Sequence, residues 1–492
     1  MRRFLIPVLS CVGLVGCAVG PDFHRPEPPA GDSVLEKDRP PPALLEADGH
    51  GQHFDKQADL PARWWARFES KELDTLVAQA LERSPTLRSA QATLHQSQNN
   101  LRAGYGVFFP QIGASIEASR QNPVVNFGRG LTQVGPYGLD TVGANVGYVP
   151  DLFGGQRRTV EALGAVVDVQ RYTMLATYLS LTSNVVNTGI ARAGYQAQRD
   201  ATIAIIGMLD DQIRVIQTQY DSGIAPYTAV LVLKTQRANN AAGVAALEQR
   251  IDQSDHLLAQ LCGRVPADFA APSIPLEQIA LPAELPDTLP STLARHRPDV
   301  LAAEASLHQA SAQIGVATAD LFPNLTLGGT LGVSHSAISD LLEAGTRFWS
   351  VQAALAGSLF SGGSQWYARK AAIDAYDAAL AQYQQTVLTA LEQVADTMRA
   401  LEHDAQALRA QADALAAASE SEKLTRANYE AGTAGYLDLL VADSQYQQAR
   451  LGYLGAVTQR LQDTVALYAA LGGGWWKDDA PVAAALHADT AH

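Results

Sequence analysis

The sequence is poor in cysteine and in charged residues, and each of these shortages excludes a class of protein. Only 3 of the 492 residues are cysteine, namely Cys11, Cys17 and Cys262, so a disulfide-stapled scaffold is excluded. Charged residues make up 17%, and the net charge of -14 argues against a nucleic-acid partner, because nucleic acid is bound by basic stripes.

Motifs that carry covalent chemistry are also missing from the sequence. It contains no Gly-x-Ser-x-Gly elbow, no Walker A loop and no His-Glu-x-x-His pair. His50 and His53 stand three residues apart without a third ligand nearby, and only 4 methionines are present. We therefore expect a protein that is not an enzyme and has no metal site and no cofactor other than a covalent lipid.

The N-terminus has the pattern of a lipoprotein signal. Arg2 and Arg3 precede an apolar run that is too short to span a bilayer, and this run ends in Leu14-Val15-Gly16-Cys17. This sequence predicts a signal peptide over residues 1–16 and a lipid, including palmitate, on Cys17. An ordinary signal peptide with an incidental cysteine is the alternative, and Ala18 after Cys17 fits sorting to the outer membrane.

Two parts of the chain do not have the composition of a packed core, because the N-terminal one is rich in proline and the C-terminal one is rich in Ala, Asp and His. Residues 17–60 are predicted to be a lipid anchor followed by an extended strap, and residues 475–492 a loose tail. A second proline-rich stretch, 264–290, is predicted to link two larger segments.

Those two segments are copies of one another. At an offset of about 210 residues, too long for a solenoid repeat, Pro85, His95 and Pro110 match Pro298, His308 and Pro323. Each copy reads as helix, β-hairpin, long helix and return helix. The first copy spans 61–263, with these elements after its first helix: hairpin about 108–150, long helix about 155–222, return helix about 226–262. The second spans 291–474, with the corresponding elements: hairpin about 323–360, long helix about 363–430, return helix about 435–471.

The predicted hairpin strands alternate strictly between apolar and small polar residues. Ile112, Ala114 and Ile116 alternate with Gly113 and Ser115 in the first strand, and three further runs repeat the pattern. Strands of this kind, about 10 residues long, are typical of membrane β-barrels. Four strands cannot close a barrel, and an open edge is not tolerated in hydrocarbon, so several chains must contribute to one barrel.

The long helices carry narrow apolar seams with coiled-coil spacing. Such helices need antiparallel partners, which the return helices supply, and Gly223 and Gly432 mark the turns. The clearest seam has 4,3 spacing in the second copy, at Val387, Leu391, Val394, Met398, Leu401, Ala405, Leu408, Ala412 and Leu415.

With these features in place, the chain resembles the outer-membrane efflux protein family, which includes TolC. Its NodT-type branch, the outer-membrane lipoproteins of resistance-nodulation-division (RND) efflux systems, is the most similar. The resemblance covers nearly the whole mature chain and is carried by these motifs: Cys17 with Val19-Gly20-Pro21-Asp22-Phe23, Trp64-Trp65, Arg297-Pro298-Asp299-Val300, and Leu359-Phe360 with Gly362-Gly363.

The resemblance implies an α+β membrane protein: a homotrimer with a 12-stranded transmembrane β-barrel, four strands per chain, and a long periplasmic α-helical barrel. It also implies the exit duct of a tripartite efflux pump that conducts drugs or other small molecules. The implied partners are a periplasmic adaptor (membrane fusion protein), an inner-membrane transporter of the RND class, and outer-membrane lipid.

The resemblance also suggests where a periplasmic gate lies. Matching the turn motifs places Asp438 on a family ring of carboxylates and Tyr429 on a tying aromatic, with Asp443, Tyr436 and Leu437 as further candidates. The family's salt bridge between the helix pairs is missing, because Ala434 and Ala229 occupy the positions of its partners, and Val441 stands where the family often has another Asp. Asp438 and Asp443 as solvated surface charges, and Tyr436 as a packing residue, remain the alternatives.

Other functions remain open at this point. The channel could serve type I protein secretion or metal efflux, although few methionines weaken the metal version. A periplasmic coiled-coil scaffold lipoprotein without a pore is a third reading, which the four amphipathic strands disfavour.

Overall fold

A computed structural model describes residues 18–27, 35, 51–55, 58, 60–122, 124–126, 131–133, 135–287, 293, 295–336, 339 and 345–477. The predicted signal peptide, the predicted lipidation site Cys17 and the end of the C-terminal tail lie outside these residues. The chain divides into two units, which we call the sheet unit and the helix unit. The sheet unit takes in residues 1–25, 95–169 and 303–383, and the helix unit takes in 26–94, 170–302 and 384–492.

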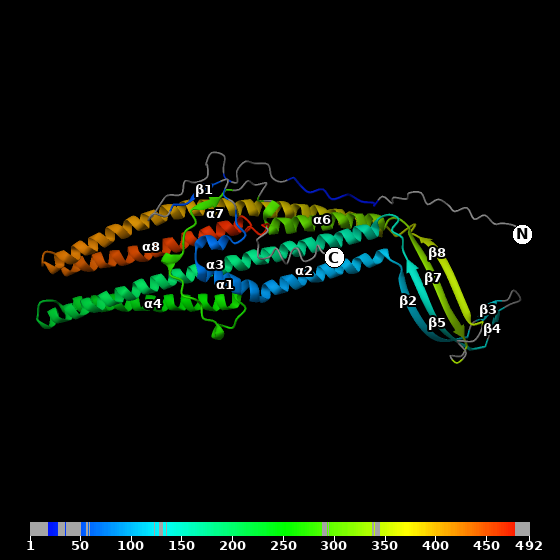
Figure 1. Cartoon of the computed structure of the whole chain (residues 1–492), viewed down its shortest axis with the longest axis horizontal. Helices are drawn as coiled ribbons and strands as arrows, with labels where there is room; N and C mark the ends of the chain where they lie inside the picture. Colours follow the sequence, from blue (N-terminus) through cyan, green and yellow to red (C-terminus); the bar gives the residue numbers. More distant parts are fainter. Residues whose placement is uncertain are drawn as a thin grey trace. The chain divides into compact units, whose positions relative to one another are not determined.

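A four-stranded antiparallel sheet dominates the sheet unit (Figure 1). Its strands, in the order in which they pair, are β2 (Gln111–Gln121), β5 (Tyr137–Tyr148), β7 (Asn324–His335) and β8 (Arg347–Ala356). The central pair, β5 and β7, joins the first half of the chain to the second. A short hairpin of β3 (Val124–Asn126) and β4 (Leu131–Gln133) lies in the connection between β2 and β5.

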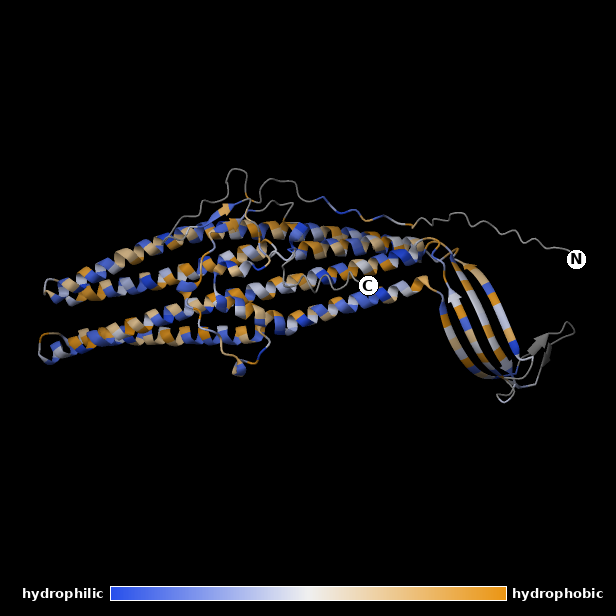
Figure 2. Ribbon diagram, in the orientation of Figure 1, coloured by the Kyte–Doolittle hydropathy of each residue, from blue (hydrophilic) through white to orange (hydrophobic). Residues whose placement is uncertain are grey.

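The register of this sheet gathers the apolar residues of all four strands on one face. Ile112 pairs with Val146, Val146 with Gly329, and Gly329 with Val351, so one row of small and aliphatic residues crosses the sheet. Because directly paired residues share a face, the polar positions fall together on the other side, where the Thr141 and Ser334 hydroxyls hydrogen-bond at 3.1 Å. Figure 2 shows the resulting alternation along the strands.

The apolar face is not covered by any other part of the described chain. Ile112 and Ile116 are each 81% exposed, and Trp349 and Val351 are 75% and 78% exposed. A face this large and this apolar marks a surface that is covered by a membrane or by another protein.

Long helices make up most of the rest. They are α1 (Lys71–Arg83), α2 (Pro85–Gly104), α3 (Gly155–Asp221), α4 (Tyr227–Leu261), α6 (Pro298–Ala319), α7 (Ser364–Glu430) and α8 (Tyr436–Ala470). The Ser70 hydroxyl accepts a hydrogen bond from the Leu73 N–H at the start of α1, and Pro85 begins α2 where its missing N–H costs nothing. At the turns α3–α4 and α7–α8, Gly223 and Gly432 both have φ 75°, a conformation that glycine adopts without strain. None of the described helices is both long and apolar enough to cross a membrane.

The apolar seam of α7 is buried along most of its length. Val394, Met398, Leu401 and Ala405 are each 3% exposed or less. Packing against neighbouring helices therefore stabilises α7 far more than helix propensity does, as expected for a helix with a narrow apolar stripe.

The strap and the proline-rich linker, which the sequence indicated to be connecting segments, also contribute to the core of the helix unit. β1 (His53–Asp55) and β6 (Glu284–Pro286) form a parallel pair between the strap and the linker, which the proline-rich composition concealed. Leu276 and Leu285 of the linker are buried. A short 3₁₀ helix, Trp64–Phe68, inserts both tryptophans, and Trp64 packs 5.6 Å from Tyr468 of α8 between ring centroids.

Candidate functional site

The residues proposed for the gate lie near the turns that join α3 to α4 and α7 to α8. We call these residues, together with the polar side chains that contact them, the helix-tip site. Its members are Gln212, Gln219, Glu422, Arg426, Tyr429, Tyr436, Leu437, Asp438 and Asp443.

Asp438 supplies one half of a capping box at the N-terminus of α8. Its carboxylate accepts a hydrogen bond from the Gly435 N–H at 2.9 Å, and a negative charge at this position also complements the helix dipole. The preceding Leu437 is 69% exposed. Asp438 thus has a structural role that the family resemblance did not suggest, and its carboxylate remains at the protein surface.

Asp443 lies inside the protomer. It is 3% exposed, and its carboxylate accepts hydrogen bonds from Gln212 of α3 and, at 3.2 Å, from Arg426 of α7. The alternative that Asp443 is a solvated surface charge is therefore wrong. Burial raises the pKa of Asp443, whereas the Gln212 hydrogen bond and the Arg426 charge act in the opposite direction.

Arg426 connects Asp443 to a second carboxylate. Its Nε lies 2.6 Å from Glu422, one turn earlier on α7. The sequence identified neither partner of Asp443, because the family's salt-bridge positions were occupied by alanine. The chain has an ion pair at different positions, and its only local signal was the i, i+4 spacing of Glu422 and Arg426.

The two tyrosines have different surroundings. The Tyr429 hydroxyl of α7 accepts a hydrogen bond from Gln219 of α3 at 3.3 Å, so this aromatic residue does tie α7 to the first helix pair. Tyr436 packs against an apolar cluster formed by α3 and α4, which includes Leu209 and Val230. Burial raises the pKa of Tyr436, and its hydroxyl has no hydrogen-bond partner among the described residues.

A second polar site, in the sheet unit, holds the residues that follow Cys17. The Val19 N–H donates to the Phe153 carbonyl at 3.0 Å, and Ala18 packs so closely on Gly154 that a Cβ there would lie 2.5 Å from the Ala18 Cα. Only glycine permits this approach, and Gly154 also has φ +83°.

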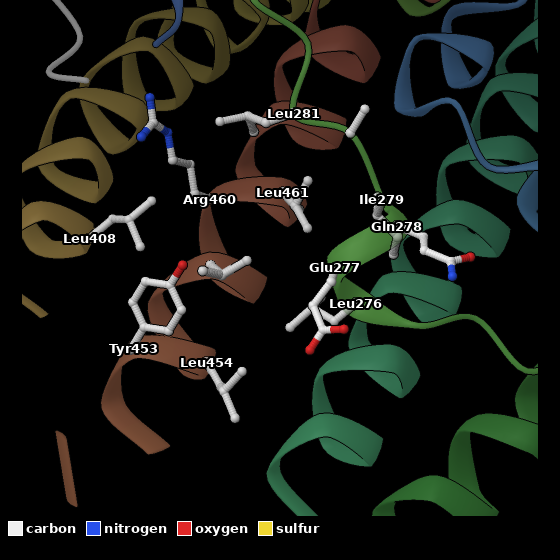
Figure 3. Close-up of a pocket in the computed structure, with 12 residues that line it drawn as sticks. Leu276, Glu277, Gln278, Ile279, Leu281, Leu408, Tyr453, Leu454, Arg460 and Leu461 are labelled. Carbon is white, nitrogen blue, oxygen red and sulfur yellow. The ribbon is translucent and has the colours of Figure 1, made fainter. Parts of the chain in front are cut away.

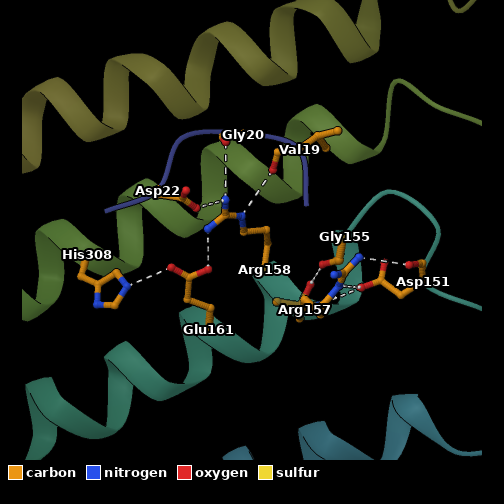
Figure 4. A network of polar contacts seen from close by, with 10 residues as sticks. Val19, Gly20, Asp22, Asp151, Gly155, Arg157, Arg158, Glu161 and His308 are labelled. Carbon is orange, nitrogen blue, oxygen red and sulfur yellow. Dashed lines mark hydrogen bonds and ion pairs between the residues drawn. The ribbon is translucent and has the colours of Figure 1, made fainter. Parts of the chain in front are cut away.

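Arg158 of α3 is the centre of this second site, which we call the strap clamp (Figure 4). Its side chain is 5% exposed and donates to the Val19 carbonyl at 3.3 Å, to Asp22 at 2.7 Å and to Glu161 at 2.7 Å. Glu161 also contacts His308 of α6 at 3.0 Å. The strap is thereby fixed between α3 and α6.

Two further contacts extend the strap clamp along α6. The Phe23 ring stacks on His308 with 4.4 Å between centroids, and Arg25 pairs with Glu304 at 2.7 Å. The sequence singled out Asp22 and Phe23 as part of a family motif but gave no indication of their partners. Together these contacts hold the chain that leads to Cys17 against the unit that contains the sheet.

Comparisons with known proteins agree with this architecture. The sequence pattern of the family described as "Outer membrane efflux protein" matches residues 76–264 and 289–473. The pyoverdine export outer membrane protein OpmQ of Pseudomonas aeruginosa is 26% identical over 420 residues, which cover 85% of this chain and 88% of OpmQ. The toluene efflux pump outer membrane protein TtgC of Pseudomonas putida is 27% identical over 478 residues, which cover 94% of each protein.

Solved structures give the same result. The outer-membrane channel OprN matches this structure with a TM-score of 0.83 at 27% identity, over 93% of this chain and 100% of OprN. Because the family pattern matches both halves of the sequence and the fold matches along nearly its whole length, the chain belongs to the outer membrane efflux protein family.

Proposed function

We propose that three copies of this chain form the outer-membrane channel of a tripartite efflux pump, through which drugs or other small molecules leave the cell passively. The observation that carries this proposal is the sheet of β2, β5, β7 and β8, which has one exposed apolar face, one polar face and, among the described residues, two open edges. Such a sheet fits a barrel wall between lipid and a water-filled lumen.

The two open edges call for further copies of the chain. Strands β2 and β8 each pair on one side only among the described residues of the sheet. Each unsatisfied backbone group in hydrocarbon costs several kcal/mol, so these edges must pair with something. Two further copies of the same chain can supply strands that pair with both edges. The family resemblance favours a trimer with twelve strands.

The strap clamp supports a lipid on Cys17. Val19 and Gly20 contact Arg158, while Val19 also bonds to Phe153, which follows β5 by a few residues. A lipid on Cys17 would then start close to the end of a strand, where it could enter the same membrane as the sheet. A single lipid chain anchors a protein only weakly, so stable anchoring requires a second membrane-binding feature. The barrel wall beside Cys17 would supply it.

The helix-tip site supports a gate. Hydrogen bonds from Gln212 to Asp443 and from Gln219 to Tyr429 join the first helix pair to the second inside one protomer. Loss of these ties would weaken the attachment of α7 and α8 to α3 and leave the apolar packing of Tyr436 to hold them. A ring of three Asp438 side chains would favour cations at the entrance, because a narrow constriction strengthens the effect of a few charges.

The partners and cargo follow from the relatives. OpmQ is named for pyoverdine export and TtgC for toluene efflux, so organic small molecules are the proposed cargo. The proposed partners are a periplasmic adaptor and an inner-membrane transporter of the RND class. Another relative, the cation efflux system protein CusC of Escherichia coli O157:H7, is 23% identical over 474 residues and keeps metal efflux as the second candidate.

Planar-bilayer recording of the purified, lipidated protein tests the channel. We expect discrete conductance steps, and a selectivity for cations that falls in Asp438→Ala. Absence of any conductance would refute the channel, whereas conductance with unchanged selectivity in Asp438→Ala would refute only the carboxylate ring. Susceptibility of a deletion strain to organic compounds and to metal salts then distinguishes the two kinds of cargo.

A further inference from the structure

Two arginines lie at one end of the apolar face of the sheet. Arg120 is the last residue but one of β2, and Arg347 is the first residue of β8. One row of paired residues joins Ile116 to Arg347 across the sheet, and Arg120 follows Ile116 by four residues, so both arginines are on the apolar face. Both side chains are exposed, and neither makes an ion pair with a residue that the structure describes. The proposed function gives them no role.

The apolar face restricts where an arginine can lie. A lipid-facing arginine is strongly destabilising at the middle of a bilayer and nearly neutral at its edge. On β2, Arg120 is eight residues from Ile112, and on β8, Arg347 is eight residues from Leu355. At about 3.4 Å per residue and a strand tilt of about 40°, eight residues span about 21 Å along the membrane normal, against about 25 Å for the apolar band of such a barrel. Both arginines therefore fall at one edge of the band.

A neighbouring side chain and the chain connections indicate which edge this is. Trp349, two residues from Arg347 on the same face, is 75% exposed, and tryptophan is typical of the membrane–water interface. Helices attach to the other end of the strands, since α2 precedes β2 and α7 follows β8. In the proposed channel the helices extend into the periplasm, so the two arginines lie at the outer edge of the membrane.

Contact between copies would bring the two arginines together. Within one chain they are on opposite edge strands, with β5 and β7 between them (Figure 1). β2 and β8 run in opposite directions, so if they pair between neighbouring copies, their hairpin ends lie side by side, about 4.8 Å apart. Because both arginines lie at the same depth, Arg347 of one copy is then beside Arg120 of the partner subunit. We call this place the edge joint.

We propose that each edge joint binds a phosphate group of lipid A, the phosphorylated glycolipid in the outer leaflet of the outer membrane; this inference rests on the proposed trimeric channel. Two guanidinium groups offer planar sets of N–H donors that match phosphate oxygens. Their aliphatic stems lie along the apolar face while the charged ends reach the headgroup level. The acyl chains of the same lipid cover exposed aliphatic residues such as Ile116 and Val351.

The charge of the surroundings fits an anionic ligand. Asp140 is the one acidic residue on this face within the four described strands. In the strand register it is opposite Ala118 of β2 and His335 of β7, and it makes no ion pair with Arg120 within the described chain. Two arginines against one carboxylate leave each edge joint with positive charge, which a phosphate complements.

An apolar cavity in the helix unit does not suit such a ligand. This cavity, of about 290 Å³, is lined by Arg460 together with Leu408 and Leu461 (Figure 3). The Arg460 guanidinium points toward α7, and its terminal nitrogens have almost no accessible surface, so a phosphate does not reach them. The volume is also far too small for a lipid with several acyl chains. The exposed arginines of the sheet are therefore the better phosphate site.

Native mass spectrometry of the full-length protein in detergent, titrated with purified lipid A, tests the proposal. We expect up to three lipid A molecules on a complex of three chains. Arg120→Gln and Arg347→Gln should each weaken binding about tenfold, the loss expected for one charge-assisted contact. Arg214→Gln, at an exposed arginine of α3 in the helix unit, is the matched control and should bind like the wild type. Because the variant side chains are all exposed, the same spectra should show three chains in each variant.

The number of bound molecules tests whether the two arginines share a site. If they do, either single variant weakens all three sites equally. A variant that loses some bound molecules and keeps the rest at wild-type affinity would show separate sites and overturn the edge joint. Unchanged affinity in the double variant would overturn the proposal and leave the channel intact, whereas a protein that stays a single chain would refute the proposed function itself.

Other ligands identify the source of the phosphate. Lipid A without its phosphates should bind at least tenfold more weakly, and inorganic phosphate at millimolar concentration should not displace lipid A, because the acyl chains also contribute to binding. Equal binding of the dephosphorylated lipid would overturn the role of the phosphate. Displacement by inorganic phosphate, or equally tight binding of phosphatidylglycerol, would show a general anion site and overturn the assignment to lipid A.

Discussion

Removal of the Asp443 carboxylate should open the channel. In Asp443→Ala, Gln212 and Arg426 both lose their bond to Asp443, and the helix-tip site loses the hydrogen bond between α3 and α8, while Tyr436 still packs against the α3–α4 cluster. Hydrogen bonds to a charged group contribute about 1.5–3 kcal/mol each. Because Arg426 is partly exposed and keeps Glu422, we discount its share for solvent screening and expect a total of about 3 kcal/mol.

That energy corresponds to a large change in gating. If both bonds exist only while the helix tips are together, about 3 kcal/mol raises the ratio of open to closed channels roughly 100-fold. Single-channel recording measures this ratio directly. Asp443→Asn is the matched variant, since its amide oxygen still accepts from Gln212, and it should show a smaller increase.

The same reasoning predicts coupling between Arg426 and Asp443. Arg426→Gln should raise the open fraction on its own, and the double variant with Asp443→Ala should open little further, because the two side chains share one contact. An Asp443→Ala channel that opens no more often than the wild type, while it remains a folded oligomer, would refute the assignment of the helix-tip site as a closing tie.

Three further predictions concern other parts of the chain. Arg158→Ala should release the strap, so that protease cleaves residues 18–25 about tenfold faster than in the wild type, whereas the exposed Arg157→Ala should not. Ile116→Lys on the apolar face should destabilise the membrane-inserted protein by about 2–4 kcal/mol, and a lysine at the neighbouring Ser115 on the polar face by much less, as measured by urea unfolding in liposomes. Burial raises the pKa of Cys262 to about 11, so its thiol should react with disulfide reagents at about pH 8 only after unfolding; rapid reaction in the folded protein would contradict the buried position.

Much of the fold could be predicted because its signals are local. A proline-free seam with 4,3 spacing specifies α7, and strict alternation specifies the strands, so helix and strand types follow from periodicity alone. The pairing of β5 with β7 could not be predicted, because nothing in either strand specifies a partner more than a hundred residues away.

The candidate site was harder to predict for the same reason. The family resemblance identified Tyr429 and Asp438, but the burial of Asp443 depends on which face of α8 turns toward α3. Its partner Gln212 is 231 residues away in the sequence. The β1–β6 pair likewise joins segments whose proline-rich composition gave no sign of a contact.

Native mass spectrometry of the detergent-solubilised protein tests the central claim most directly, because β2 and β8 need partners from other copies if the sheet lies in a membrane. We predict a complex of three identical chains, each carrying the added mass of a lipid. A protein that stays a stable single chain in mild detergent would contradict the proposed channel.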